Sequence, residues 1–242
     1  MILVIFGSKS DSEVYSRIAG LLKAANAPFE LRIASAHKTP KLVSEILRKD
    51  YKVIIAGAGL AAHLPGVVAA QKTCPVIGVP CTGSYDGLDA FLSIAQMPPG
   101  IPVLAVGVNN ADEAANAAIM IGKGINKVNL VGENEQCEKT LRELGVDYTK
   151  GSFNSAAVNI SFQKLGSNVA QRKELAIYCP IAEKTGAGDA VAAMKMAKSG
   201  LWVGVNRTEN AAVAAAEITG KNIDGYRDAL AKKVIDADRE AK

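Results

Sequence analysis

Phe29-Glu30-Leu31-Arg32-Ile33-Ala34-Ser35-Ala36-His37-Lys38-Thr39-Pro40 is the stretch that says most about the fold of this 242-residue chain. Its first five residues alternate as in a short strand. Thr39 and Pro40 suit the N-cap and first residue of a helix that follows with the apolar residues Val43, Ile46 and Leu47. His37 therefore follows the carboxyl end of a strand, where open α/β sheets bind ligands. Taken alone, such a histidine is more often a capping or packing residue than a catalyst.

The same alternation of strand and helix extends outward in both directions. Apolar runs predict strands at residues 2–6, 29–33, 53–56, 76–79 and 101–106, and helical patterns lie near 10–26, 40–49, 63–72, 87–96 and 110–122. A βαβ series of this kind predicts a parallel sheet with helices on its faces. After Gly122 the pattern restarts.

Composition and charge argue against several classes of function. Hydrophobic residues make up 49% of the chain, yet no apolar run approaches the length of a membrane span, and the sequence begins like a strand rather than a charged leader, so we expect a cytoplasmic protein. The four cysteines are widely spaced and have no histidine set nearby, which predicts neither disulfides nor a metal site. The net charge of +4 comes from interleaved charges without a basic aromatic stripe, so nucleic acid is not an expected partner.

The first predicted connection, residues 7–13, reads Gly-Ser-Lys-Ser-Asp-Ser-Glu. Ser10 and Glu13 have the spacing of a capping box at a helix N-terminus. Free N–H groups and hydroxyls at that position suit an anion such as phosphate, and Asp11 suits ribose hydroxyls. The alternative is that Ser10 and Asp11 only cap the helix.

Small residues dominate the connection at 57–66, Gly-Ala-Gly-Leu-Ala-Ala-His-Leu-Pro-Gly, where backbone amides can approach a ligand closely. His63 in this segment either lines a site or is a buried, hydrogen-bonded histidine. The segment also matches a loose dinucleotide-binding fingerprint. Its context argues against that, because the next strand ends at Val79-Pro80-Cys81 without the acidic ribose ligand, and Pro65-Gly66 is expected to interrupt the helix.

Five motifs in order resemble the PurE family of purine biosynthesis. They are Gly-Ser-x-Ser-Asp at 7–11, Ser-Ala-His-Lys-Thr-Pro at 35–40, Ala-Gly-x-Ala-Ala-His-Leu-Pro-Gly at 58–66 with Leu60 in the usual glycine position, Gly-Leu-Asp at 87–89 and Gln-Met-Pro-Pro-Gly-Ile-Pro at 96–102. The resemblance covers residues 1–125 and implies a three-layer flavodoxin-like α/β domain with a parallel sheet. It also implies chemistry on a carboxylated aminoimidazole ribonucleotide, with no cofactor or metal.

The family contains two activities. A mutase moves a carboxylate from the exocyclic nitrogen to ring carbon four, and a carboxylase takes CO₂ directly. At Lys38 the sequence resembles the direct carboxylases, which have lysine at this position, whereas mutases usually have arginine. His63, in contrast, is a feature of the mutases. We expect the mutase and keep the direct carboxylase as the alternative.

His37 is the expected catalytic residue, because an imidazole can both donate and accept a proton near neutral pH. The resemblance implies that Ser8 and Asp11 hold the ribose and phosphate side of the nucleotide and that Lys38 contacts the phosphate. Loop 57–62 is expected to supply backbone donors to the travelling carboxylate and to exclude water. The expected substrate-binding residues are Ser8, Ser10, Asp11, Ser35, Ala36, Lys38, Gly57, Ala58, Gly59, His63 and Leu64.

The second half, residues 126–242, looks like a degenerate copy of the first. Residues 186–190 align within the segment 85–90 when Asp189 is set on Asp89, and residues 200–206 resemble segments of 100–109. The copy reads Gly-Glu-Asn-Glu at 132–135 in place of the first motif and has no counterpart of the His63 segment. We therefore expect two domains, a catalytic one at 1–125 and an inactive one at 126–242.

Two other readings compete with this one. Residues 185–189, Thr-Gly-Ala-Gly-Asp, resemble the anion hole and base of a ribokinase-like sugar kinase, but the match is short and Glu183 stands where that family has aspartate. The second competing reading is a non-catalytic sensor that binds nucleotide phosphate. Both histidines of the chain lie in the intact half, which argues against it.

Residues 223–241 predict an amphipathic helix that packs on a neighbour. The resemblance implies octamers of single domains. If residues 126–242 replace every second subunit, four chains build a pseudo-octamer, so we expect a homotetramer with four active sites.

Overall fold

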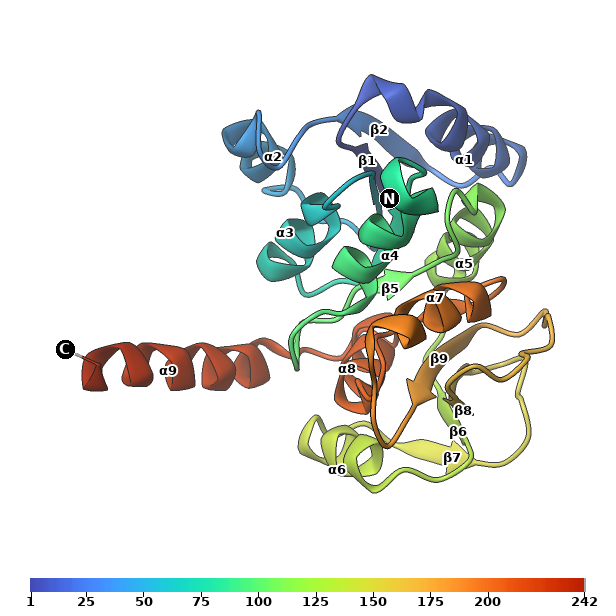
Figure 1. Ribbon diagram of the computed structural model, residues 1–242, viewed down its shortest axis with the longest axis vertical. Helices are drawn as coiled ribbons and strands as arrows, with labels where there is room; N and C mark the ends of the chain where they lie inside the picture. Colours follow the sequence, from blue (N-terminus) through green and yellow to red (C-terminus); the bar gives the residue numbers. More distant parts are fainter. Residues whose placement is uncertain (242) are drawn as a thin grey trace.

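The computed structural model describes residues 1–241, whose strands form a ten-stranded sheet in the order β2-β1-β3-β4-β5-β10-β9-β8-β6-β7 (Figure 1). The strands are β1 Ile2–Phe6, β2 Phe29–Ile33, β3 Val53–Ala58, β4 Val76–Pro80, β5 Leu104–Ala105, β6 Val128–Val131, β7 Tyr148–Lys150, β8 Val158–Lys164, β9 Ala176–Ile181 and β10 Leu201–Trp202. The helices are α1 Ser12–Ala24, α2 Pro40–Ile46, α3 His63–Gln71, α4 Leu88–Ala95, α5 Ala111–Lys123, α6 Glu135–Glu143, α7 Ala187–Met196, α8 Thr208–Ile218 and α9 Asp224–Glu240, with short 3₁₀ turns at Lys9–Asp11 and Ser84–Gly87.

The strand pairs are parallel except at the centre of the sheet, where Ala105 of β5 faces Trp202 of β10 in an antiparallel pair. On each side of this junction the strands have the same relative order, the second beside the first, then the third, fourth and fifth. The predicted parallel α/β fold is thus confirmed. Because the junction is antiparallel, the carboxyl edges of the two halves point to opposite ends of the sheet.

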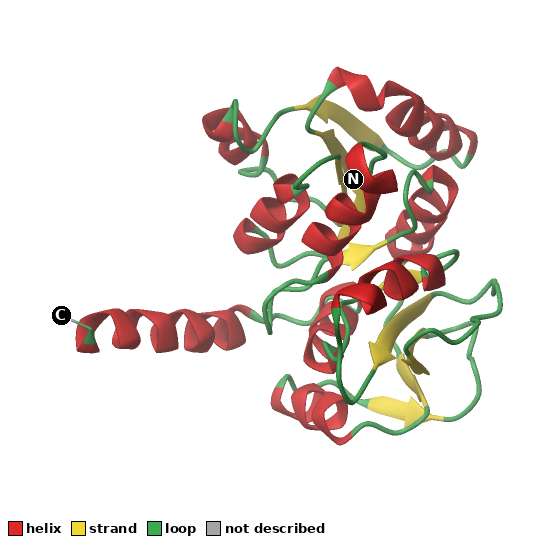
Figure 2. Cartoon of the chain, viewed as in Figure 1, coloured by secondary structure: helices red, strands yellow, loops and turns green. Residues whose placement is uncertain are grey.

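Helices cover both faces of the sheet and complete the three layers (Figure 2). One buried cluster joins the sheet to α1, α5, α6 and α8 through residues such as Leu22 and Leu141. The other joins it to α2, α3, α4 and α7 through residues such as Val68 and Met196. Trp202 is 1% exposed, so the junction between the halves lies inside the apolar core rather than at a solvated contact.

Loops replace two helices in the second half. Among residues 1–241, no helix lies between β7 and β8 or between β8 and β9. The buried amide of Asn159 instead donates to the carbonyls of Asn154, Ala157 and Leu175, and it accepts from Asn129. These bonds satisfy backbone groups that helices would otherwise satisfy internally. The second half therefore lacks the elements that carry His37 and His63 in the first.

The two halves share one local turn in detail. Asn109 and Asn206 both have positive φ angles, of 56° and 59°. The N–H of Asn109 donates to the Pro80 carbonyl at 2.8 Å, and the N–H of Asn206 donates to the Pro180 carbonyl at the same distance. Asparagine tolerates this left-handed conformation better than most residues, which explains its presence at both turns.

Three local expectations were wrong. The capping box of Ser10 and Glu13 does not form, because a 3₁₀ turn precedes α1 and Ser8 caps that turn by accepting from the N–H of Ser10. Pro65 does not interrupt α3, since it lies in the first turn, where an N–H has no helical partner. The strand expected at 101–106 is reduced to Leu104–Ala105; Pro102, which precedes it, cannot donate to a ladder.

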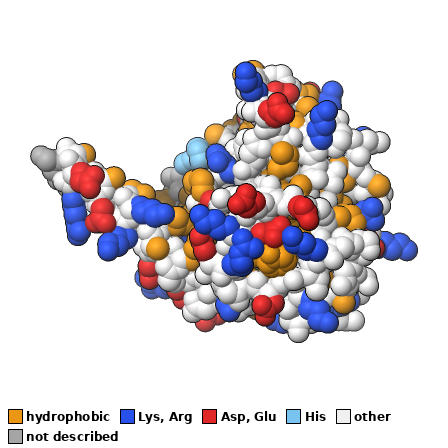
Figure 3. Space-filling view, turned by 90° about the horizontal axis from the view of Figure 1, so that it is seen from below, with side chains coloured by type: hydrophobic (Ala, Val, Ile, Leu, Met, Phe, Trp, Pro, Cys, Tyr) orange, Lys and Arg blue, Asp and Glu red, His pale blue; other side chains and the backbone are white. Residues whose placement is uncertain are grey.

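Helix α9 extends away from the body of the chain, at the left of Figure 1. None of its residues is buried, and Val234 and Ile235 are 72% and 51% exposed. Figure 3 shows the mixed charges along this arm and the histidine side chains that reach the surface near its root. Within residues 1–241, no helix is both long and apolar enough to cross a membrane.

Candidate active site

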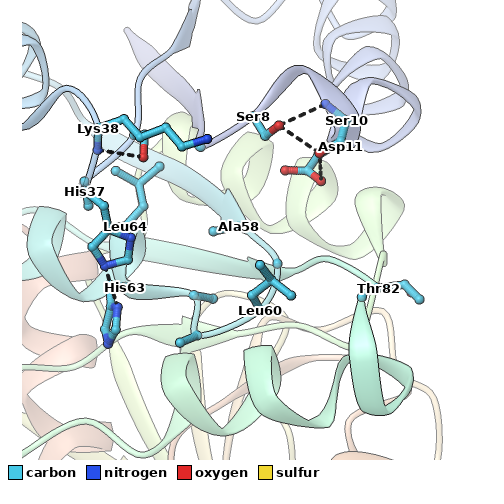
Figure 4. A pocket seen from close by; sticks show the side chains of 17 residues that line it. Ser8, Ser10, Asp11, His37, Lys38, Ala58, Leu60, His63, Leu64 and Thr82 are labelled. Carbon is cyan, nitrogen blue, oxygen red and sulfur yellow. Dashed lines mark hydrogen bonds between the residues drawn. The ribbon is translucent and has the colours of Figure 1, made fainter.

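The loops that follow β1, β2, β3 and β4 enclose a cavity of about 400 Å³ at the carboxyl edge of the first half (Figure 4). Parallel strands place their carboxyl ends along one edge, so loops that are far apart in sequence meet there. The lining residues are Gly7, Ser8, Ser10, Asp11, Ser35, Ala36, His37, Lys38, Ala58, Gly59, Leu60, Ala61, Ala62, His63, Leu64, Thr82 and Gly83.

Ser8, Ser10 and Asp11 form a hydrogen-bonded group on the first loop. The Ser10 hydroxyl lies 2.8 Å from Ser8 Oγ and 3.1 Å from Asp11 Oδ1. Asp11 occupies the N-cap position of α1 but makes no side-chain cap, so its carboxylate remains available to the cavity. Burial raises the pKa of the Asp11 carboxyl, and the Ser10 hydroxyl opposes this rise. These groups can both donate to and accept from sugar hydroxyls.

The loop after β2 is closed by its own side chains. The N–H of Ser35 donates to Thr39 Oγ1 at 2.9 Å, and the N–H of Lys38 donates to Ser35 Oγ at 3.2 Å. This turn presents His37 and Lys38 to the cavity ahead of α2. Among residues 1–241, Lys38 is the one cationic side chain in the lining, and it extends along the rim in the direction of Ser8 (Figure 4).

The two histidines of the chain contact each other directly. His37 Nε2 lies 2.8 Å from His63 Nδ1, and the ring planes are 86° apart. His63 is the first residue of α3, and both imidazoles are exposed to solvent. One of the facing nitrogens must carry the proton and the other must accept it. His37 Nδ1 makes no hydrogen bond within residues 1–241, so this is the ring atom left for a ligand.

The loop after β3 brings backbone close to the cavity at Ala58, Gly59 and Leu60. Leu60 has a φ of 56° and is 62% exposed, and a side chain in this left-handed conformation costs on the order of 1 kcal/mol. Gly59 lies so close to the next loop that an added Cβ would stand 3.3 Å from the Cys81 carbonyl oxygen. The segment therefore forms a tightly packed wall whose backbone faces the cavity.

Of the residues expected from sequence, only Gly57 is outside the lining. It is buried in β3, and an added Cβ would stand 2.1 Å from the ring of Phe6. Gly57 thus allows Phe6 to pack beneath the site instead of facing a ligand. The structure brings the catalytic candidate His37 and the other ten expected residues together around one cavity.

Sequence reasoning did not single out Gly7, Thr82 and Gly83 as lining residues, and it expected Leu60, Ala61 and Ala62 only as part of loop 57–62. Thr82 is held in place by Asn109, whose Nδ2 donates to Thr82 Oγ1 at 2.6 Å. The signal was present, because Thr82 and Gly83 directly follow β4 and so belong to the same sheet edge.

The motif at residues 185–189 has a structural explanation. Asp189 Oδ2 accepts from the N–H of Gly186 at 2.8 Å, which caps the beginning of α7. Its carboxylate is thus engaged as a helix cap. Within residues 1–241, no group of three or more histidine, cysteine, aspartate or glutamate side chains is placed to hold a metal ion.

Comparisons with known proteins agree with the cavity's position in the first half. A protein of Methanocaldococcus jannaschii named N5-carboxyaminoimidazole ribonucleotide mutase is 52% identical over 122 residues, which is 50% of this chain and 78% of that protein. Phosphoribosylaminoimidazole carboxylase of Candida albicans is 46% identical over 159 residues, covering 60% of this chain but 28% of that longer protein.

A crystal structure of PurE from Treponema denticola is 31% identical, covers 48% of this chain and 76% of that one, and superposes with a TM-score of 0.43. The family model described as AIR carboxylase matches residues 1–143, which is more than half of the chain. On this match, supported by the archaeal relative, the chain belongs to the AIR carboxylase family.

Proposed function

We propose that the chain is an enzyme of purine biosynthesis that converts N5-carboxyaminoimidazole ribonucleotide to 4-carboxy-5-aminoimidazole ribonucleotide. The observation that carries this proposal is the pair of His37 and His63, 2.8 Å apart, in a cavity that also contains a carboxylate and an ammonium group. The similarity to a protein named as the mutase supports the choice of reaction.

Charge and position suggest how the nucleotide lies. Lys38 contacts the phosphate, and Ser8 and Asp11 hold the ribose and phosphate side from the opposite loop. Ser10, Ser35, Ala36 and Leu64 complete the walls, while Ala58 and Gly59 offer backbone donors to the travelling carboxylate. This orientation places the aminoimidazole ring near His37.

The reaction moves one carboxylate and one proton. The bond between the exocyclic nitrogen and the carbamate carbon breaks, releasing CO₂, and His37 donates a proton to that nitrogen. Carbon four of the ring then attacks CO₂, and His37 takes back the proton that carbon four loses. No proton is gained or lost overall, as an isomerisation requires.

The histidine contact adds a way to set the protonation of His37. When His37 Nε2 carries the proton toward His63 Nδ1, neutral His37 has a lone pair on Nδ1 and acts as a base. When His63 carries a proton on both ring nitrogens and its Nδ1 donates instead, His37 carries its proton on Nδ1 and acts as an acid, because the His63 proton passes to His37 Nε2 as Nδ1 gives up its own. The partner imidazole therefore selects which role Nδ1 can perform.

The alternative reaction is direct carboxylation of aminoimidazole ribonucleotide by CO₂, which Lys38 favours by resemblance. This reaction releases a proton, which must leave the site after His37 accepts it. His63 is solvent-exposed and can pass that proton from its other ring nitrogen to water. The third candidate, a non-catalytic protein that binds nucleotide phosphate, needs neither imidazole.

One experiment separates the three candidates. The protein is incubated with aminoimidazole ribonucleotide and bicarbonate, and separately with the N5-carboxylated ribonucleotide, and the products are separated by chromatography. A mutase converts the carboxylated nucleotide rapidly without added bicarbonate. A direct carboxylase acts on aminoimidazole ribonucleotide at a rate proportional to CO₂, and a binder converts neither while still retaining nucleotide.

We propose further that residues 1–125 form the catalytic domain and residues 126–242 a degenerate repeat without a site of its own. The equal strand order on both sides of the β5–β10 junction supports the repeat. The missing helices between β7 and β8 and between β8 and β9 support the loss of activity. Calorimetric titration with substrate nucleotide should then give one site per chain, and two sites would contradict the proposal.

The exposure of the site in the single chain is the basis for a proposal about its assembly. A mutase must keep released CO₂ away from bulk water, yet both histidines are exposed in the single chain, as is α9. We propose a cytoplasmic homotetramer that forms a pseudo-octamer and covers each site with a neighbouring chain. Four chains of 25.3 kDa give about 100 kDa, which light scattering can measure, and a stable monomer would contradict the assembly.

A further inference from the structure

Arg227 on α9 connects the second half of the chain to the helix that carries His63. Its Nη1 donates to the carbonyl of Ala69 at 3.1 Å, and its Nη2 forms a 2.9 Å ion pair with Glu217 on α8. Both side chains are nearly inaccessible, with 12% of Arg227 and 2% of Glu217 exposed. The guanidinium is therefore held between two elements instead of moving freely in solvent.

Ala69 lies in the last turn of α3, where backbone carbonyls have no helical partner. A cation at this end also interacts favourably with the helix dipole. Arg227 thus caps the C-terminal end of the helix whose first residue is His63. Arg227 Nε is buried without a hydrogen-bond partner among the described residues, so the two bonded nitrogens determine its position.

The length of α3 makes its far end sensitive to this cap. Ala69 lies six positions after His63, which corresponds to about 9 Å along the helix axis. Tilting the helix by about 5° moves its first residue by about 0.8 Å over that length. A displacement of that size along the line between the two nitrogens would lengthen the 2.8 Å contact of His37 and His63 beyond the range of a hydrogen bond.

The neighbouring helix shows the same arrangement. Lys72 Nζ donates to the carbonyls of Leu47 and Lys49, just beyond the end of α2, and α2 begins directly after the turn that presents His37. Each of the two site helices is thus held at its C-terminal end by a basic side chain from elsewhere. For α2 that side chain comes from the first half, and for α3 it comes from α9.

We propose that Arg227 is a positioning residue for His63, through which residues 126–242 support a site that they do not line. The kinetic part of this inference rests on the proposed function, whereas its structural part concerns only the two histidines. Arg227 touches neither the cavity nor His63, and acts through α3.

The test needs variants that keep the fold. Arg227→Gln alone would remove the bond to Ala69 and the contact with Glu217 together, so its effect could not be assigned to either one. The informative comparison is therefore Glu217→Gln, which retains the bond from Arg227 to Ala69, against the double variant Glu217→Gln/Arg227→Gln, which removes it. Tyr226→Phe is the matched control, because Tyr226 joins α9 to Glu209 of α8 and makes no hydrogen bond to α3.

The first readout is nitrogen NMR of the full chain labelled with ¹⁵N-histidine. The chain has two histidines, so the ring signals report on this pair alone. In Glu217→Gln and Tyr226→Phe, the His63 ring nitrogens should keep the wild-type shifts of one tautomer. In the double variant they should move toward the averaged values of an imidazole that exchanges between tautomers.

The second readout is turnover by the double variant. Its kcat should fall about tenfold relative to Glu217→Gln, because the pair is misplaced, while the KM for nucleotide stays within about twofold. Identical His63 ring shifts in Glu217→Gln and in the double variant would overturn the inference, whatever the activity. If the wild-type protein turns over neither substrate, the proposed function fails, and the NMR comparison still decides whether Arg227 positions His63.

Discussion

Replacing His37 by asparagine tests the proposed chemistry most directly. Asparagine keeps a polar side chain of similar shape but cannot carry a proton at neutral pH. The other titratable groups of the lining are Asp11, Lys38 and His63. His63 lies 2.8 Å from His37 Nε2, on the side away from Nδ1, so it cannot occupy the same position against the ring of the substrate.

The expected loss of rate is large because no other titratable group of the lining can take the place of His37. A positioned acid or base contributes about 10² to 10⁴ in rate, and His37 serves both the donating and the accepting step. We expect kcat of His37→Asn to fall by about 10³ or more, which corresponds to about 4 kcal/mol of transition-state stabilisation. Nucleotide affinity should stay within about tenfold, because the contacts with phosphate and ribose are unchanged.

The assay combines steady-state product analysis with calorimetric binding of nucleotide. His63→Asn is the matched control, and it should lose only about tenfold in kcat, since it removes the partner of the catalytic imidazole but not the imidazole itself. Retention of more than about a tenth of the wild-type rate by His37→Asn would refute the assignment of His37 as proton carrier. Equal losses in both variants would refute the separate roles given to the two histidines.

The remaining predictions concern substrate binding and stability. Lys38→Ala should raise the KM for nucleotide with little change in kcat, because its charge interacts with phosphate in ground and transition states alike, and an unchanged KM would place Lys38 elsewhere. Burial raises the pKa of Glu217 to about 8, despite the opposing effect of Arg227. The folded state then binds that proton more tightly than the unfolded chain, so the stability contributed by Glu217 is present at low pH and is lost as pH rises through about 8. Denaturant unfolding between pH 5 and 9 should show this decline in the wild-type protein and a flatter profile in Glu217→Gln, and parallel profiles would disprove it. Gly57→Ala should lower the free energy of unfolding by about 1 to 3 kcal/mol, because the added methyl group pushes on the Phe6 ring. Gly20→Ala, with open space around it in α1, should be neutral or stabilising. Equal melting temperatures for the two variants would contradict this.

Sequence patterns alone predicted the parallel α/β fold and named most of the residues that line the cavity. Strand and helix periodicity are local properties, so β1 and β2 were located to the residue and α3 and α4 nearly so. The position of the cavity could be predicted because parallel strands end at a common edge. This brings residues 8, 37 and 63 together without any knowledge of packing. Family motifs then selected His37 among the loop residues.

Tertiary structure decided what depends on contacts between distant segments. Ser8 rather than Ser10 caps the first turn, and Gly57 makes room for Phe6 instead of facing a ligand, because packing against the neighbouring strand determines which way each group points. The 2.8 Å contact between His37 and His63 joins residues 26 positions apart, and the bond from Arg227 to Ala69 spans 158 positions. No periodicity or spacing encodes such distances. They arise only when helices pack on the sheet and when β5 and β10 join the two halves into one core, since a shift of less than 1 Å makes or breaks a hydrogen bond.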